Sequence, residues 1–505
     1  MKKKIAHSKT PTRPLFIRII SHNLFFWGVV VIFILNALWI ALSAVYPMMF
    51  DEELHFGVIE IYSHQLSPFI TNQAAETVFH GDLTRLSSYF FHYLMSFPYR
   101  FITLFTQDIA TQVIFLRIIN ILFVVVGLWL FRKLLRLGGF SSALTNITLF
   151  FFVLVPLVPF TAAHINYDNL IMIFTPALFY VALRSIQKSP KQSAWVLATI
   201  SIGCLGSLTK FTFLPIFVAT VVFILFFLWR QHGKNIFKEI WSQYIHLKKP
   251  LLVILTLLAL VSSGLFIERY GGNLVQYRTH EPKCDRIHSK ELCSQYNVWN
   301  RNTQWAEKYQ QNQTPLWNPV EYTFYRWIPH IFNDLFRAGA YTGGAIQIRQ
   351  PLGTLEYTSG TIALRVMGWI VFIGALIASV ITWRRLKNKQ LRYLFLGSIG
   401  LYAVALWVKN YSDYTTYGIP VATQGRYFIP FLIPLIAMAG YAVSAAIKKE
   451  YIKGIALGIA LLLFTQGAGA TTYIIYSNNN WYWPNNTVVQ VNNNAKNFLK
   501  LFIRT

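Results

Sequence analysis

Eleven apolar segments constrain this sequence more than any other feature. A helix needs roughly 20 apolar residues to cross a bilayer, and soluble domains rarely combine 54% apolar with only 13% charged residues. We therefore predict an all-α polytopic bundle of about eleven transmembrane helices. The segments are 22–46, 112–131, 143–163, 167–186, 194–208, 211–229, 251–268, 361–383, 393–408, 428–447 and 454–475.

Two of these segments, 194–208 and 393–408, are too short for a simple crossing. Each is expected either to tilt or to end below the surface beside a cavity. The basic segment 1–18 has no small-residue cleavage site after its apolar run. We therefore expect the first span to be a retained anchor and not a removed signal peptide.

The distribution of charge indicates an orientation. If the N-terminus is cytoplasmic and the chain changes side at each span, the inner segments contain 25 of the 45 Lys and Arg residues. Glu239 and Glu450 are the only acidic residues on that side. This distribution follows the positive-inside rule. The net charge of +26 is therefore explained by membrane topology and does not indicate binding to nucleic acid. The C-terminus is then predicted to lie outside.

The predicted topology divides the chain into four regions. A membrane module, 1–268, includes a first outer loop at 47–111, in which segments 86–95 and 99–105 are amphipathic and typical of helices on a membrane surface. A large outer loop, 269–360, precedes C-terminal membrane helices at 361–475 and an outer tail at 476–505. The loop and tail are rich in Trp, Tyr, Asn and Gln, which suits sugar binding, although an ordinary interfacial loop has the same composition.

The three cysteines divide between the membrane and the outside. Cys204 falls inside a span, where a cysteine usually serves packing. Cys284 and Cys293 are nine residues apart in the large outer loop. Because that side is oxidising, we predict a disulfide between them, with two free thiols as the alternative.

Four short polar segments meet the predicted outer face. Carboxylates and cations at the rim of a bilayer are costly and usually functional. In chain order, the segments are Asp51-Glu52 with His55, the turn containing His164, Asn166 and Asp168, the turn ending at Lys210, and the segment around Arg426.

These residue types fit transfer from a lipid phosphate. Lys210 and Arg426 suit phosphate binding, and Arg117 and Arg365 are candidates for the same cluster. A carboxylate beside them, Asp51 or Glu52, can take a proton from an attacking hydroxyl, while the cations stabilise the leaving phosphate.

Each of these residues also has a purely structural interpretation. The acids can form a solvated turn, the cations can reach out to ordinary phospholipid headgroups, and Asp168 and His164 can cap a tight hairpin. No cofactor is required by the predicted chemistry. A divalent cation held by Asp51, His164 and Asp168 remains an alternative, which spacing alone does not support.

The four segments, in this order, resemble the GT-C superfamily, integral-membrane glycosyltransferases that use polyprenyl-phosphate sugars. The motifs are Asp51-Glu52 after the first span, Asn166-Tyr167-Asp168, Leu208-Thr209-Lys210 and Gln424-Gly-Arg-Tyr427. The architecture is also similar to the serotype-converting O-antigen glucosyltransferases of enteric bacteria and their phages. The resemblance covers roughly 20–230 and 360–447. No clean His-Pro-Pro follows the first loop, and only Phe97-Pro98-Tyr99 stands near that place, so the branch and the sugar stay open.

The resemblance implies roles for individual residues. Asp51 matches the catalytic acid of the first loop and would be the base, with Glu52 as the alternative. Lys210 and Arg426 stand where related enzymes contact the lipid phosphate. Asp168 stands where some members place a second acid, and His164 and His55 are candidate acceptor contacts.

We therefore expect an inverting hexosyltransferase at the periplasmic face of the bacterial inner membrane. It would move a sugar such as glucose from undecaprenyl phosphate to a surface glycan, by analogy a lipid-linked O antigen. A separate donor synthase and a flippase would have to supply the donor. An O-antigen polymerase and a non-enzymatic translocase of lipid-linked sugars are the alternatives. The polymerase would depend on outer-loop arginines more than on Asp51, and the translocase would favour symmetry-related halves.

Overall fold

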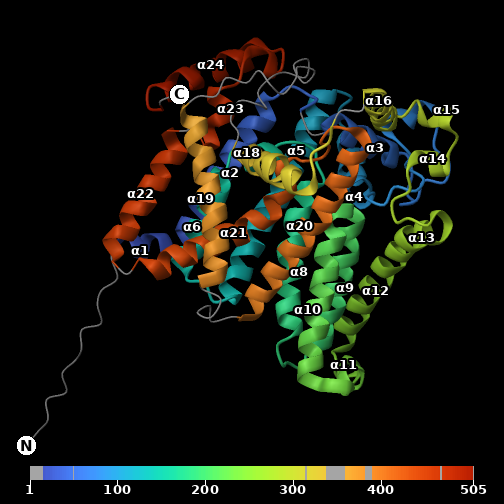
Figure 1. The fold of residues 1–505 in the computed structure, drawn as a ribbon, viewed down its shortest axis with the longest axis horizontal. Helices are drawn as coiled ribbons and strands as arrows, with labels where there is room; N and C mark the ends of the chain where they lie inside the picture. The colour runs from blue at the N-terminus through green and yellow to red at the C-terminus, as the bar shows by residue number, and fades with distance from the viewer. Residues whose placement is uncertain are drawn as a thin grey trace, which may run out of the picture.

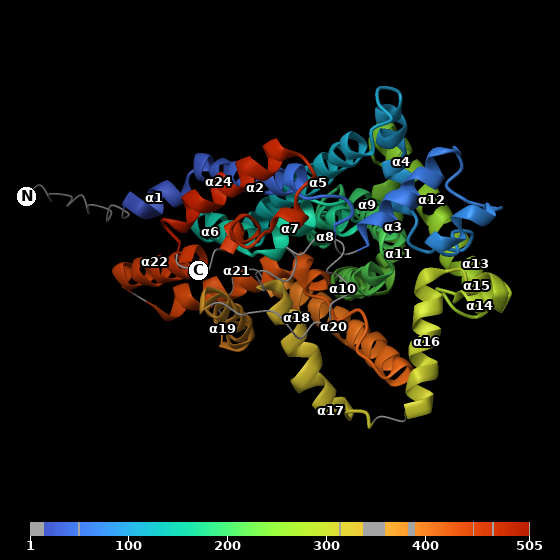
Figure 2. The ribbon, with the colours of Figure 1, turned by 90° about the horizontal axis from the view of Figure 1, so that it is seen from above.

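The chain folds as an assembly of α-helices (Figures 1 and 2). The computed structural model describes residues 15–48, 51–312, 315–336, 359–381, 389–447, 449–466 and 469–503. Within these ranges there is no β-strand, and Ala44 and Tyr482 form an isolated antiparallel bridge. The predicted all-α membrane class is confirmed.

Seven helical segments of the described chain are long and apolar enough to cross a membrane. They are Asn23–Ser43 (α2), Ile109–Leu137 (α5), Gln192–Thr209 (α9), Phe211–Ile245, Lys249–Tyr277, Lys389–Tyr417 (α20) and Gly425–Ala446. Phe211–Ile245 includes Leu214–His232 (α10) and Ile236–Ile245 (α11), Lys249–Tyr277 includes Lys249–Phe266 (α12), and Gly425–Ala446 includes Ile429–Ala446 (α21). Each coincides with one of the eleven predicted spans. The count of eleven itself stays a prediction.

The other four predicted spans are also helical within the described residues. They correspond to Ser142–Leu154 (α6) with Leu157–Ala162 (α7), to Asp168–Ser185 (α8), to Ser359–Ile381 (α19), and to Glu450–Gln466 (α22) with Thr472–Ile475 (α23). The break between α6 and α7 has a local cause. Pro156 disfavours the helical conformation for the residue before it, and Val155 is accordingly extended, at φ −65° and ψ 121°.

The expectation that 393–408 is a short span is wrong. The helix there, α20, runs for 29 residues from Lys389 to Tyr417, about 43 Å at 1.5 Å per residue. The apolar pattern predicted only the middle of this helix, because polar residues occupy both of its ends. The other short span, 194–208, forms the 18-residue helix α9.

Helices distant in the sequence build one bundle. α5 packs along α8, α8 along α9, and α9 along α12, while α10 packs against α20 and α21 lies between α19 and α6. The largest cluster of buried apolar side chains draws on α2, α5, α6, α8, α10, α20 and α21. The core therefore joins the two predicted membrane modules, and residues from both can meet in one site.

The first outer loop folds into a helical layer against the bundle. It contains Glu52–Ser63 (α3), the short 3₁₀ helix Ala75–His80 and Phe90–Thr103 (α4). The two predicted amphipathic segments, 86–95 and 99–105, contribute to the single helix α4. α4 buries Phe91, Met95 and Tyr99 against α3 and α5.

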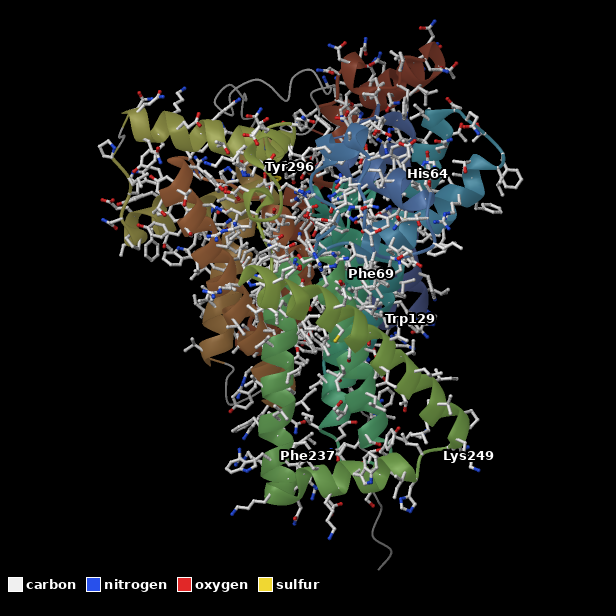
Figure 3. All side chains as sticks on the ribbon, turned by 90° about the vertical axis from the view of Figure 1, so that its right-hand side faces the viewer. His64, Phe69, Trp129, Phe237, Lys249 and Tyr296 are labelled. Atoms are coloured by element: carbon white, nitrogen blue, oxygen red, sulfur yellow. A yellow bond between two sulfur atoms is a disulfide. The ribbon has the colours of Figure 1, made fainter. Side chains whose placement is uncertain are left out.

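The large outer loop and the amphipathic helix α11 lie at opposite ends of the molecule. The loop forms Cys284–Ile287 (α14), Lys290–Cys293 (α15), Asn297–Asn312 (α16), Pro319–Glu321 (α17) and Ile328–Leu335 (α18). Tyr296 and His64 mark one end in Figure 3, and Phe237 and Lys249 mark the other. Phe237 lies on α11, Ile236–Ile245, which buries none of its residues.

The C-terminal tail closes over the end of α2. The helix Asn486–Lys500 (α24) places Asn492 where its side chain accepts from Trp39 Nε1 at 2.8 Å and donates to Ser43 Oγ at 3.0 Å. Trp483 N donates to the Ser43 carbonyl at 3.0 Å. The two side-chain bonds tie residues 453 and 449 positions apart, and together with the backbone bond they cover the end of α2.

Candidate functional site

Asp51 has an unusual backbone for an aspartate at a helix start. It precedes α3 in the left-handed region, at φ 67° and ψ 26°, and makes no capping hydrogen bond. An Asp at this position normally caps the helix, and a left-handed non-glycine residue stores strain that tends to collect at functional sites. Its carboxylate instead reaches Arg426, whose Nη2 lies 3.1 Å from Asp51 Oδ2. The local conformation thus turns the carboxylate from its own helix to the site.

Asp51, Arg426, Asp168 and Lys210 form a cluster of two cations and two carboxylates. Arg426 Nε lies 3.8 Å from Asp168 Oδ2, and Lys210 Nζ is paired with Asp168 Oδ1. The side chains of Arg426, Lys210 and Asp168 are only 2 to 6% exposed, whereas Asp51 is 56% exposed. Asp51 is therefore the member of the cluster that solvent and a substrate can reach.

Arg426 is positioned by a close contact with α18. It lies on the short 3₁₀ helix Gly425–Phe428 that opens the α21 segment. A Cβ at Gly425 would fall 2.6 Å from the Ile331 carbonyl, so only glycine fits there. Gly425 N also donates to the buried Asp334 carboxylate at 2.7 Å. Gly425 and Asp334 were not among the predicted site residues, because neither shows its role without the fold.

Lys210 lies where α9 ends, between two membrane-crossing segments. Its ammonium is 4.7 Å from the Tyr167 ring centroid and 4.2 Å from that of Tyr427, distances typical of cation–π contacts. Burial and the nearby Arg426 charge outweigh the attraction of Asp168 and lower the pKa of Lys210 to about 8. The two tyrosines also escaped prediction, although Tyr427 follows Arg426 directly.

Glu52 is the neighbour of Asp51 and has the opposite environment. It is fully buried, and Arg117 donates to it twice, from Nε at 2.9 Å and from Nη2 at 2.7 Å. Met48 N and Ile165 N donate to the same carboxylate at 2.7 and 3.1 Å. Burial alone would raise the pKa of Glu52, but the Arg117 charge and hydrogen bonds lower it. These four bonds occupy the carboxylate, so the geometry does not favour Glu52 as the base.

Arg117 does not match its predicted role as a phosphate ligand. Its remaining nitrogen, Nη1, donates to the carbonyls of Ala41 and Ala44 at 3.0 and 2.6 Å, and the side chain is fully buried. The guanidinium is thus occupied by Glu52 and the end of α2. The side chain of Arg365, the other predicted ligand, lies outside the described residues.

His55 is turned into the protein, toward His92. Its Nδ1 is 2.9 Å from His92 Nε2, and both rings are buried. Burial lowers the pKa of His92 to about 3 and holds that of His55 well below its ordinary value. The pair is therefore neutral at pH 7, beside the Tyr167 ring at 4.6 Å from His55. His92 is a further residue of this region that sequence analysis missed.

An amide network holds the turn that carries His164 and Asp168. Asn169 Nδ2 donates to Asn120 Oδ1, to the Thr161 carbonyl and to the His164 carbonyl at 2.9 to 3.0 Å. His164 is buried, with Nδ1 3.0 Å from the Phe160 carbonyl. Asp168 thus joins the charge cluster as predicted, while His164 faces its own helix. Among the described residues, no three His, Cys, Asp or Glu side chains are grouped to hold a metal ion.

One residue of the large outer loop, Tyr296, lies in the electrostatic field of Asp51. Burial, Glu281 and the Asp51 charge together raise the pKa of Tyr296 to about 12, which places this loop residue within electrostatic range of Asp51. The predicted disulfide between Cys284 and Cys293 is present in the same loop, with Cα atoms 5.7 Å apart. Helix α16, which follows, packs on α20.

Comparison with known protein families and with curated proteins finds no match to this chain. The site's own geometry is therefore the basis for a functional proposal.

Proposed function

We propose that the chain is an inverting glycosyltransferase that uses a polyprenyl-phosphate sugar. Asp51 would be the base, and Lys210 and Arg426 would bind the donor phosphate. The observation that carries the proposal is the asymmetry of the charge cluster. The accessible carboxylate of Asp51 contacts the buried guanidinium of Arg426, and the buried ammonium of Lys210 is linked to Arg426 through Asp168. A buried cation pair suits a phosphate, and an accessible carboxylate beside it suits proton abstraction.

The transfer step uses these groups in one displacement. Asp51 takes the proton from an acceptor hydroxyl, and that oxygen forms a bond to the anomeric carbon of the sugar. The bond between the anomeric carbon and the phosphate oxygen breaks, and its electron pair leaves with the polyprenyl phosphate. Lys210 and Arg426 stabilise the added negative charge. Attack opposite the leaving group inverts the anomeric centre.

Binding of the donor changes the charge balance of the cluster. In the structure, Arg426 and Lys210 are neutralised by Asp51 and Asp168. A phosphate drawn to Arg426 would compete with Asp51 for the same guanidinium. Loss of that contact would free the Asp51 carboxylate oxygen to accept a hydrogen bond from the acceptor hydroxyl, so donor binding itself prepares the base.

The proposal includes a membrane orientation and an acceptor. The positive-inside distribution supports a position of Asp51, the large loop and the tail outside the cytoplasm, which is the periplasmic face in a Gram-negative bacterium. The charge of Asp51 contributes to the raised pKa of the loop residue Tyr296, and this supports an acceptor site between the loop and the bundle. A surface glycan is the acceptor class we favour, with a hexose as the sugar.

The test compares surface-glycan mass in cells expressing the wild type, Asp51→Asn or Glu53→Gln. Glu53 is the matched control, because it is an exposed acid two positions along the same chain segment. We expect a fixed mass increment per repeat in the wild type and in Glu53→Gln, and none in Asp51→Asn at equal expression. Transfer that survives Asp51→Asn would refute the proposed base. A change in chain length without an increment would favour the polymerase.

A further inference from the structure

A second charged cavity lies at the other end of the bundle from Asp51. It has a volume of about 470 Å³ and is lined by Arg132, Lys133 and Arg136 of α5, by Arg184 of α8, and by neutral residues including Tyr180 and Ser142. α8 begins at Asp168 and carries Arg184 in its last turn. These 16 positions correspond to about 24 Å along a helix, close to the thickness of a bilayer core.

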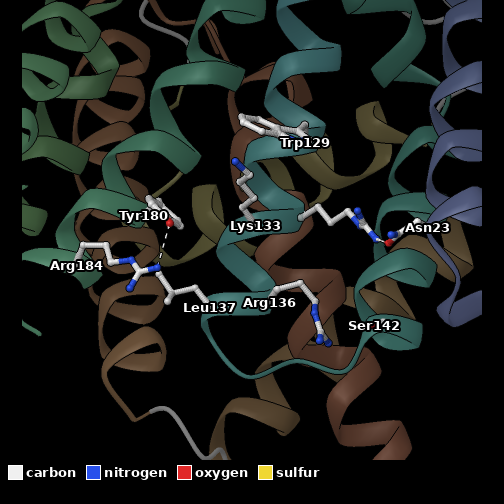
Figure 4. A pocket seen from close by; sticks show the side chains of 9 residues that line it. Asn23, Trp129, Lys133, Arg136, Leu137, Ser142, Tyr180 and Arg184 are labelled. Carbon is white, nitrogen blue, oxygen red and sulfur yellow. Dashed lines mark hydrogen bonds between the residues drawn. The ribbon is translucent and has the colours of Figure 1, made fainter.

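The cations of this cavity are oriented by neutral groups. Arg132 donates to Asn146 Oδ1 at 3.3 Å and to Asn23 Oδ1 at 2.6 Å, and it packs on the Phe26 ring at 4.5 Å. Arg184 donates to Tyr180 Oη at 3.2 Å and to Gln187 Oε1 at 3.0 Å. Figure 4 shows Lys133 and Arg136 on α5 and Arg184 with Tyr180 on the neighbouring helix. The charges therefore occupy defined positions, unlike cations that extend freely to the bilayer surface.

No carboxylate balances these charges in the described part of the chain. No Asp or Glu lines the cavity, and none of the four cations takes part in an ion pair there. Arg184 Nε is buried and has no hydrogen-bond acceptor among the described residues. Four like charges around one concave space repel one another, so the cavity is electrostatically incomplete without an anion.

A larger, mainly apolar cavity adjoins the charged one. Its volume is about 1040 Å³, and its apolar lining includes Val222, Phe223, Phe226 and Phe227 of α10 and Leu394 of α20. Arg230, Lys389 and Gln390 line it too, so its polar side is also cationic. Leu137 lines both cavities. A cationic space beside an apolar space of this size matches a ligand with a phosphate and acyl chains.

We propose that the charged cavity binds a phosphate group from the cytoplasmic side, and that the phosphate belongs to an anionic lipid of the inner leaflet. Basic cavities between transmembrane helices recognise such headgroups. The inference rests on the proposed orientation and is independent of the transfer reaction at Asp51. A soluble phosphate compound shares the same chemistry, and the experiment separates the two sources.

The test is native mass spectrometry of the full chain in detergent, with phosphatidylglycerol, phosphatidylcholine of the same acyl chains, or inorganic pyrophosphate added in turn. We expect phosphatidylglycerol to bind at least tenfold more tightly than phosphatidylcholine. Retention of pyrophosphate without lipid preference would support the phosphate site but assign it to a soluble anion. Absence of preference for phosphatidylglycerol together with absence of pyrophosphate binding would overturn the proposal.

Two paired variants locate the binding. Arg136→Gln with Arg184→Gln removes two charges from the cavity and should lower phosphatidylglycerol affinity about tenfold or more, at roughly 1 kcal/mol per basic residue. Lys188→Gln with Lys191→Gln removes two exposed charges from the following inner segment and should change affinity less than about threefold. Equal losses in both would show diffuse surface attraction and refute the site. Lys133→Gln, whose ammonium rests on Trp129 at 3.4 Å, gives a milder cavity variant if the double variant unfolds.

Discussion

Asp51 and Glu52 are adjacent carboxylates with opposite environments. Glu52 is sealed inside the protein, with Arg117 and two backbone amides occupying both oxygens. Asp51 is largely exposed and touches a single guanidinium, that of Arg426. A buried ion pair with every donor matched has a fixed partner and little capacity to take up a proton. If Asp51 is the base, as we propose, accessibility and unused hydrogen-bonding capacity distinguish it from Glu52 more than proximity to cations does.

The largest expected effect is the loss of transfer activity on substitution of the exposed acid, Asp51. Asp51→Asn should reduce transfer by about 10²- to 10⁴-fold, the usual contribution of a positioned general base, without lowering the unfolding temperature. Asn tolerates the left-handed conformation of position 51, so the fold is retained. Single-turnover transfer and thermal unfolding in detergent measure both quantities. A large drop in the unfolding temperature of Asp51→Asn would indicate that Asp51, like Glu52, has a structural role.

Substitution of the buried acid, Glu52, should lower the stability of the fold. Glu52→Gln leaves Arg117 as an unmatched buried charge, which typically costs about 3–5 kcal/mol. Combining it with Arg117→Met removes both charges and should restore part of that loss. Unfolding of the two single variants and the double variant in detergent forms the test. If Glu52→Gln keeps full stability yet abolishes transfer, the roles assigned to the two acids must be exchanged.

The pH dependence of donor binding should sharpen the role of Lys210. Its pKa is lowered to about 8, so the ammonium is charged below this pH and loses its charge as the pH rises through it. The donor KM should then rise by about tenfold per pH unit above 8, since the charged fraction falls by that factor. Lys210→Arg keeps its charge and should flatten the profile from pH 7 to 9.5. The same slope in both proteins would mean that another group titrates.

The smallest effect is expected from the outer disulfide. Cys284→Ser with Cys293→Ser opens a loop of nine residues, a closure worth about 2–3 kcal/mol to local order. Because the charge cluster lies on the bundle, we expect transfer to fall less than threefold, mainly through acceptor KM. Limited proteolysis of 269–312 should become faster. A collapse of turnover with unchanged KM would place part of the catalytic machinery in the loop.

The fold class and the segments that contribute to the charge cluster could be predicted from the sequence. The side-chain contacts within the cluster could not. Apolar length located the helices, and charge located Asp51, Asp168, Lys210 and Arg426, which the structure brings together. The two acids could not be told apart, because Arg117 is 65 residues from Glu52 and Arg426 is 375 residues from Asp51. The partner of Arg117 could not be predicted for the same reason, because it depends on how α3 packs against α5. The length of α20 was missed because polar residues extend it.

The Glu52–Arg117 pair also has a consequence for how the chain enters the membrane. A lone arginine within an inserting helix is costly, by about 2.5–3.5 kcal/mol at the helix centre, and Arg117 lies in the third turn of α5. Its neutralising partner, Glu52, is the first residue of α3, and its other hydrogen bonds end on the last turn of α2 and the residue after it. The end of α2 and the start of α3 therefore supply the partners of Arg117, and these segments should leave the insertion machinery together with α5. Position 52 would then influence biogenesis before any substrate is bound.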